Sequence, residues 1–177
     1  ANQIKLSAKA IERYLDILEA TYVNYRVPSF SGNLGNELKK STKTYLYDLG
    51  IRNAILKDFS GISERADKGI LLESFVFLKL NASLGPNAEI RFWRTKEGDE
   101  VDFILLKDRK PIPIEVKSRL TETETPRGLK KFLARHKAKT AYVVNENLND
   151  TIRRDACEIR FITFADFEKE FTPNKEF

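Results

Sequence analysis

Residues 98–118, GDEVDFILLKDRKPIPIEVKS, read as two strands joined by a tight turn, with acidic side chains set among apolar ones. Side chains two residues apart lie on the same face of a strand. Glu100 and Asp102 are therefore expected to point the same way, as are Glu115 and Lys117. Their apolar neighbours are predicted to face the core: Val101, Phe103, Ile114 and Val116. If the two strands are adjacent, four ionisable groups converge at one edge of a sheet.

The segments around this stretch alternate between helical and strand patterns. An apolar run at 70–80 predicts a buried helix that ends at 85–87, where glycine and proline occur. Strands are expected at 89–95, 100–106, 112–117, 140–144 and 159–162, and helices at 127–138 and 165–170. Short turns let the first three strands pair antiparallel, whereas the helix at 127–138 is a crossover that lets the next strand run parallel. The predicted fold class is α/β, an α+β mixed sheet flanked by helices.

The N-terminal part is predicted to be a separate segment. Ser7 can cap a helix over 8–20, because its hydroxyl can accept a hydrogen bond from a free amide of the first turn. A strand at 22–27 follows, which together with the helix resembles the back half of a winged helix. Residues 29–42 read as a loop and 43–56 as a helix. The predicted division is therefore a helical, partial winged-helix segment at 1–42 and a second domain at 43–177.

Charge is concentrated in one part of the chain. The protein has 177 residues and a net charge of +5, yet residues 107–139 alone contain eleven Lys or Arg and four Asp or Glu, a local surplus of seven. A basic cluster is typical of proteins that bind nucleic acid, and the alternative is a solvated, lysine-rich surface. No stretch approaches the roughly 20 apolar residues of a membrane span. The single cysteine, Cys157, excludes an internal disulfide and favours a cytoplasmic location.

The acidic residues suit a divalent metal ion. Carboxylates held close together are costly unless a cation lies between them, and carboxylate oxygens are the ligands that Mg²⁺ prefers. Glu73 interrupts the apolar run at 70–80, so it is expected to face something polar. Lys117 can orient or help to deprotonate a metal-bound water, or stabilise charge on a phosphate. The alternative is a solvated strand face on which Lys117 pairs with Glu100 or Glu115.

At these residues the chain resembles the PD-(D/E)xK nuclease superfamily, which has a restriction-endonuclease-like core. It is most similar to the DUF4143 domain at the C-terminus of prokaryotic AAA-type ATPases. The matching motifs are KTYLYDLGI at 43–51, GILLESFVF at 69–77, FWRT at 92–95, EVDF at 100–103 and IPIEVK at 112–117. The resemblance implies that Asp102 and Glu115 bind Mg²⁺ or Mn²⁺, that Lys117 positions or activates a water, and that Glu73 binds a second metal or a bridging water. Val101 stands where the superfamily's name has proline.

The resemblance also implies partners. The sequence has no P-loop motif, so ATP would be bound by an upstream ATPase domain in a longer parent protein. DNA is the expected substrate, and five basic residues of the helix at 127–138 are predicted to contact its phosphates: Arg127, Lys130, Lys131, Arg135 and Lys137. Because the family is marked by its fold more than by a shared activity, the alternative is a non-catalytic module. Such a module would bind nucleic acid or protein and direct the ATPase.

Overall fold

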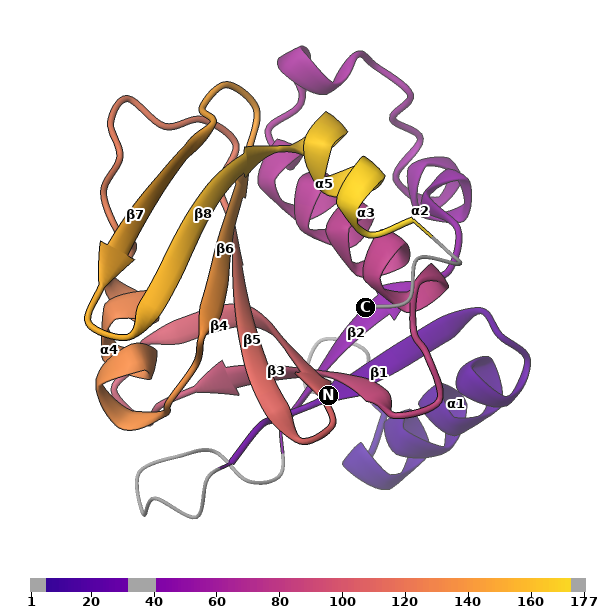
Figure 1. Ribbon diagram of the computed structural model, residues 1–177. Coiled ribbons are helices and arrows are strands. Elements are labelled where there is room, and N and C mark those ends of the chain that lie inside the picture. The colour runs from indigo at the N-terminus through magenta and orange to yellow at the C-terminus, as the bar shows by residue number, and fades with distance from the viewer. Residues whose placement is uncertain (1–5, 32–40, 173–177) are drawn as a thin grey trace.

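A computed structural model describes residues 6–31 and 41–172, and its centre is a six-stranded sheet in the order β3-β4-β5-β6-β8-β7 (Figure 1). The strands are β3 (Ala88–Arg94), β4 (Glu100–Lys107), β5 (Lys110–Val116), β6 (Thr140–Asn145), β7 (Asp150–Arg154) and β8 (Cys157–Thr163). The helices are α1 (Ala8–Ala20), α2 (Leu49–Leu56), α3 (Lys68–Ala82), α4 (Arg127–Arg135) and α5 (Phe164–Glu170), with a short 3₁₀ helix at Ile62–Glu64. A separate two-stranded ribbon consists of β1 (Asn24–Pro28) and β2 (Thr42–Leu46).

The sheet is mixed, as the sequence predicts. β3, β4 and β5 pair antiparallel, and β5–β6 and β6–β8 pair parallel, because α4 crosses over between β5 and β6. The β4–β5 turn consists of Asp108 and Arg109, which both have positive φ, the geometry of a two-residue hairpin. The sequence does not predict β7, because its residues DTIRR contain a single apolar side chain and pair with β8 at the edge of the sheet.

Helices cover both faces of the sheet. In Figure 1, α3 and α5 lie to the right of the sheet and α4 lies to the left. Phe77 and Leu80 of α3 belong to the same buried cluster as Ile114 of β5, whereas Leu129 of α4 packs with Val143 of β6. α3 is apolar on most of its circumference and buries six residues, as expected for the central helix of the core. Among the described residues, no helix has the length and apolar character needed to cross a bilayer.

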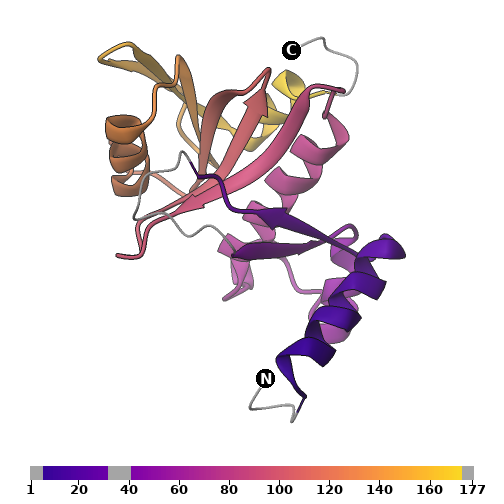
Figure 2. The ribbon, with the colours of Figure 1, turned by 90° about the horizontal axis from the view of Figure 1, so that it is seen from below.

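The N-terminal part combines one helix with the β1–β2 ribbon. Figure 2 shows α1 and this ribbon on the side of the molecule opposite β7 and β8. Ser7 caps α1 by accepting a hydrogen bond from the amide of Ala10, as predicted. β1 pairs with β2, and Val27 and Tyr45 both belong to the main core cluster. The ribbon thus joins residues on both sides of the predicted division at 42/43, which stays a prediction.

The predicted helix over 43–56 is wrong in its first half. Residues 42–46 form strand β2, because TKTYL alternates and contains the β-branched and aromatic residues that suit a strand. The helix begins only at Leu49, after Asp48, whose carboxylate accepts a hydrogen bond from the amide of Gly50. This correction brings Lys43 to the candidate site described below.

A β-bulge in β4 is a second departure from the prediction. Arg91 pairs with Ile104 and Trp93 pairs with Val101, so Asp102 and Phe103 lie together opposite one residue of β3. The extra residue shifts the alternation of side chains. Val101 therefore belongs to a cluster with Trp93 on the α4 face, whereas Phe103 belongs to the cluster on the α3 face. The expectation that Val101 and Phe103 point the same way is wrong, because a bulge places two residues where a regular strand has one.

Candidate functional site

The candidate site lies where β4 and β5 separate. Their paired residues run from Lys107 opposite Lys110 to Phe103 opposite Ile114, and the ladder ends there. Just beyond it, Asp102 Oδ2 accepts a hydrogen bond of 2.8 Å from the backbone amide of Val116. The bulge therefore turns the Asp102 carboxylate toward the open end of β5.

Lys43 lies among three carboxylates at this point. Its Nζ is 3.0 Å from Glu73 Oε1 and 3.6 Å from Asp102 Oδ1, and it also forms an ion pair with Glu100. The amine lies 5.6 Å from the centre of the Phe92 ring, which adds a cation–π contact. Sequence reasoning missed Lys43 because the residue was assigned to a helix. The alternating pattern of residues 42–46 is the signal that could have found it.

Two further contacts hold the acidic residues. The Tyr45 hydroxyl donates a hydrogen bond to Glu73 Oε1, and burial together with the Glu73 carboxylate raises the pKa of Tyr45 far above its usual value. Glu100 forms a second ion pair, with Arg94. Tyr45 and Lys43 come from the same strand, two residues apart, so β2 supplies the donors that face α3 and β4.

Burial and repulsion raise the pKa values of the two central carboxyl groups. The pKa of Asp102 is raised to about 7, chiefly by burial and then by the Glu115 and Glu73 carboxylates, while Lys43 opposes the shift. Burial also raises the pKa of Glu115, against the effect of Lys117. Glu115 is buried, and its Oε2 has no hydrogen-bond partner among the described residues. An unpaired, buried carboxylate oxygen is costly, so this atom is ready to accept a ligand.

Lys117 is held as a cation in this arrangement. Its Nζ lies 2.8 Å from Glu115 Oε1. Burial lowers the pKa of the Lys117 amine, but the carboxylates of Glu115, Asp102 and Glu73 outweigh burial and leave the pKa above its usual value. A protonated amine stabilises negative charge and cannot accept a proton. This protonation state suits charge stabilisation or the orientation of a water, and it does not suit deprotonation of that water by Lys117.

The acidic residues have the right donor chemistry for a divalent ion. Glu73, Asp102 and Glu115 offer carboxylate oxygens, and the free Glu115 Oε2 fits a ligand role. However, within residues 6–31 and 41–172 no group of three or more His, Cys, Asp or Glu has the arrangement of a metal site. Lys43 supplies the positive charge between Glu73 and Asp102 instead.

The basic residues predicted on the helix at 127–138 do not form one free surface. Arg127 and Lys131 both pair with the buried Asp99. Lys130 pairs with Glu124, and the Arg135 guanidinium lies 5.8 Å from the centre of the Trp93 ring. Lys137 lies beyond the end of α4, which stops at Arg135, and it is exposed.

Gly128 explains how the start of α4 is held near the site. A Cβ atom at this position would lie 1.8 Å from the Glu100 carbonyl oxygen, so only glycine allows the helix to approach β4 this closely. Sequence reasoning missed this role, because nothing local in the sequence shows which backbone the helix touches.

Comparisons with known proteins agree with the resemblance at the level of the family. The chain is 28% identical over 128 residues to the uncharacterized protein Rv2008c of Mycobacterium tuberculosis. The matched segment covers 71% of this chain and 28% of that protein. It is 28% identical over 174 residues to the uncharacterized protein MJ1544 of Methanocaldococcus jannaschii, which covers 97% of this chain and 34% of that protein. The chain thus spans about a third or less of the length of these relatives.

Two family models match the chain. The model of a domain of unknown function, DUF8612, matches residues 1–62, and that of another domain of unknown function, DUF4143, matches residues 68–164. No solved structure matches it. The DUF4143 match contains the α3, β4 and β5 residues of the candidate site and more than half of the chain. The protein therefore belongs to the DUF4143 family.

Proposed function

We propose that this chain is a PD-(D/E)xK-type nuclease domain, with a restriction-endonuclease-like core, that binds DNA and cleaves it with Mg²⁺ or Mn²⁺. The observation that carries the proposal is the hydrogen bond from the Val116 amide to Asp102, which places this carboxylate beside β5, where Glu115 raises its pKa. The buried Oε2 of Glu115 has no hydrogen-bond partner among the described residues. Glu73 of α3 contributes to the same electrostatic environment, since its carboxylate raises the pKa of Asp102.

The chain's own residues have separate roles in this proposal. Asp102 and Glu115 would hold the metal ion, which would supply an activated water and stabilise charge on the phosphate, and Glu73 would bind a second metal or a bridging water. Lys117 would stabilise charge on the scissile phosphate through its protonated amine. Lys43 would compete with the metal, because it already neutralises Glu73 and Asp102.

The proposal includes a parent protein with an ATPase module that binds ATP. Its support is the resemblance to the C-terminal domain of AAA-type ATPases, and the greater length of the relatives is compatible with it. In that arrangement the ATPase would act on the DNA that this domain holds.

The position of Lys43 favours a second candidate, a non-catalytic module that binds nucleic acid or protein and directs an ATPase. A lysine that occupies the space between the carboxylates can replace a metal ion permanently. A domain with such a site would keep the fold but would not cleave DNA.

The test is cleavage of linear, branched and single-stranded DNA in 5 mM Mg²⁺ or Mn²⁺, with Mn²⁺ binding measured by calorimetry. Wild type is expected to cut at least one substrate, and Asp102→Asn/Glu115→Gln to lose roughly 100-fold or more of the rate, because the charges that act in the transition state are gone. Glu89→Gln/Glu122→Gln, which removes two exposed carboxylates, is the matched control and is expected to cut like wild type. DNA binding with neither Mn²⁺ binding nor cleavage would support the non-catalytic module and reject the nuclease.

A further inference from the structure

A groove of about 900 Å³ lies at the end of the sheet where β5 begins. Three parts of the chain line it: the β4–β5 turn with its flanking residues, the C-terminal end of α4 with residues up to Thr140, and the β7–β8 turn. The volume is near the upper end of the range for ligand sites. The groove is separate from the carboxylates, because Ile112, its last lining residue on β5, lies three residues before Glu115, and a strand rises about 3.3 Å per residue.

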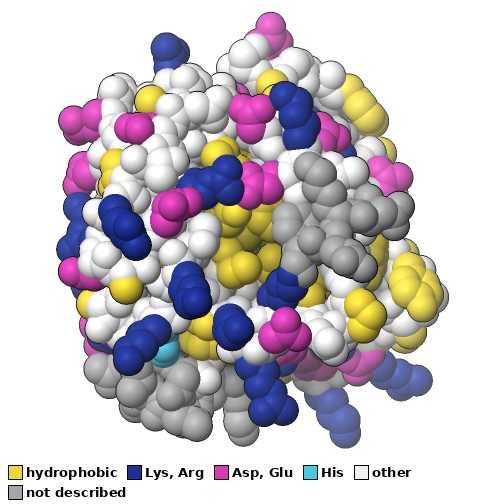
Figure 3. All heavy atoms as spheres, viewed as in Figure 1, with side chains coloured by type: hydrophobic (Ala, Val, Ile, Leu, Met, Phe, Trp, Pro, Cys, Tyr) yellow, Lys and Arg dark blue, Asp and Glu magenta, His cyan; other side chains and the backbone are white. Residues whose placement is uncertain are grey.

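The groove is strongly basic. Six of its residues are cationic: Lys107, Arg109, Lys110, Lys137, Lys139 and Arg154. Asp108 and Asp155 are its acidic residues, which leaves a surplus of four positive charges. Figure 3 shows dark-blue side chains gathered around the cyan histidine at the lower left of this face.

These cations differ in their ion pairing from three of the four basic residues of α4. Arg127, Lys130 and Lys131 each pair with a carboxylate, whereas no ion pair joins any of the six groove cations to a described carboxylate. Five of the six side chains are exposed, and Lys107 is half-buried. The groove therefore keeps its charge available for an external anion.

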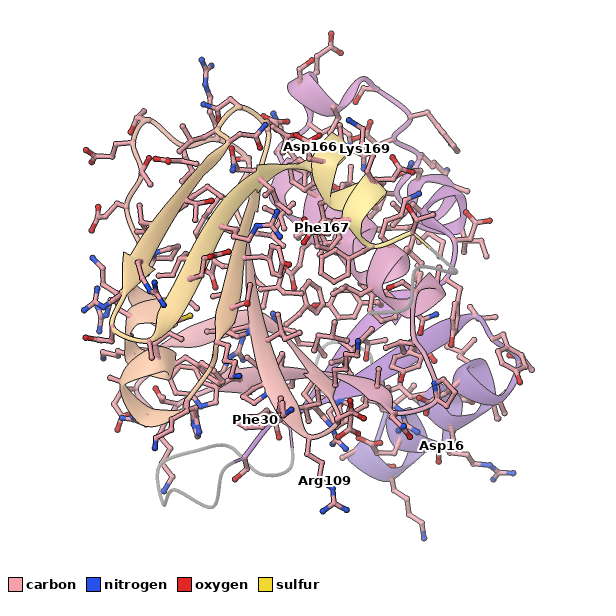
Figure 4. All side chains as sticks on the ribbon, viewed as in Figure 1. Asp16, Phe30, Arg109, Asp166, Phe167 and Lys169 are labelled. Atoms are coloured by element: carbon pink, nitrogen blue, oxygen red, sulfur yellow. The ribbon has the colours of Figure 1, made fainter. Side chains whose placement is uncertain are left out.

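The β4–β5 hairpin contains a repulsion that an anion would relieve. Lys107 and Lys110 are direct partners across the two strands, and like charges placed opposite one another destabilise a sheet. Between them, Arg109 adopts a φ of 63°, and Figure 4 shows its side chain extending from the turn into solvent. Three cations are thus presented from a four-residue hairpin.

We propose that this basic groove binds the phosphate backbone of a nucleic acid. The lining contains no glycine and no helix N-terminus to cradle a single phosphate, so an extended polyanion fits it better than a mononucleotide. It also contains no Phe, Tyr or Trp on which a base could stack. Recognition is therefore electrostatic and independent of sequence. The inference rests on the nucleic-acid ligand of the proposed function, but not on cleavage.

The test measures binding of fluorescent 20-nucleotide duplex and single-stranded DNA by anisotropy, in EDTA, between 50 and 200 mM NaCl. The groove variant is Lys110→Gln/Lys137→Gln/Lys139→Gln, in which all three residues are exposed. Removing three phosphate contacts is expected to weaken duplex binding at least about ten-fold and to reduce the slope of log K against log salt by about 2.7. Because binding is measured in EDTA, where no metal-dependent cleavage can occur, a failed nuclease leaves this inference standing.

The matched control removes the same charge elsewhere. Lys9→Gln/Arg13→Gln/Lys96→Gln replaces three exposed cations outside the groove and is expected to change the salt slope less than the groove variant does. Equal losses in the two variants, or no DNA binding by wild type, would overturn the proposal. So would groove-dependent binding to phosphatidylserine vesicles without binding to either DNA, since that result would identify a membrane as the ligand.

Discussion

Replacement of Lys43 by methionine separates its role as an internal cation from the packing of its side chain. The Lys43→Met variant keeps an aliphatic chain of similar length over Phe92 but removes the charge that faces Glu73, Glu100 and Asp102. Glu100 keeps its ion pair with Arg94, so Glu73 and Asp102 are the carboxylates most affected by the loss of the lysine charge. The variant is therefore expected to be less stable than wild type at neutral pH, and to bind divalent cations more tightly.

The magnitude follows from how exposed these groups are. The side chains of Lys43, Glu73 and Asp102 are 17%, 26% and 16% exposed, which is closer to a buried pair than to a surface pair. Breaking a buried pair costs 3–5 kcal/mol and breaking an exposed pair at most about 1 kcal/mol. A loss of about 2–3 kcal/mol in the free energy of unfolding is therefore expected at pH 7.5. The loss should shrink at pH 5, because the pKa of Asp102 is already about 7 in wild type and its carboxyl takes up a proton.

The assay is urea unfolding at pH 7.5 and pH 5, with and without 10 mM Mg²⁺. Magnesium at 100 times its Kd would raise the free energy of unfolding of the variant by about 2.7 kcal/mol. It would stabilise wild type less, because there Lys43 competes with Mg²⁺ for the carboxylates. Lys130→Met is the matched control, because its partner Glu124 is 69% exposed, and it is expected to change stability by less than 1 kcal/mol. If Lys43→Met is as stable as this control, or if Mg²⁺ stabilises both variants equally, the assignment of Lys43 as the stand-in for a metal ion is refuted.

Three other substitutions test the site and its support by urea unfolding. Asp102→Asn is expected to have the same free energy of unfolding as wild type near pH 4 and a higher one, by up to about 4 kcal/mol, at pH 8. The reason is that a carboxyl group with a raised pKa destabilises the wild-type fold as the pH rises from about 4 to 7. A difference in the free energy of unfolding that is the same at both pH values would contradict this. Gly128→Ala should lower the free energy of unfolding by about 2–3 kcal/mol, because the added methyl group clashes with the Glu100 carbonyl, even though alanine favours helices. A higher free energy of unfolding would be inconsistent with that close contact. Asn145→Ala should cost about 2–4 kcal/mol, because the buried amide bonds five backbone groups, and a loss below 0.5 kcal/mol would argue against that role.

The predictions from local pattern succeeded where one physical signal dominated. The apolar run of α3 and the hairpin from β4 to β5 were predictable, because helix burial and turn geometry depend on residues that are close together in the sequence. The strand at 42–46 was mistaken for a helix, since five residues are too few for the period to be decided without the partner strand. The pairing of Arg127 and Lys131 with Asp99 was not predictable either, because it joins residues that are far apart in the chain.

By itself, the sequence determined the mixed sheet, the order of its central elements and the presence of Asp102 and Glu115 on neighbouring strands, with Lys117 directly after the second of them. These features depend on periodicity and on short connections, which are local. Tertiary structure alone decided that Lys43 lies among the carboxylates and that the unpaired positive charge gathers at the far end of β5. Both depend on contacts between distant segments, and the energy of a charge depends on how those segments exclude water from it.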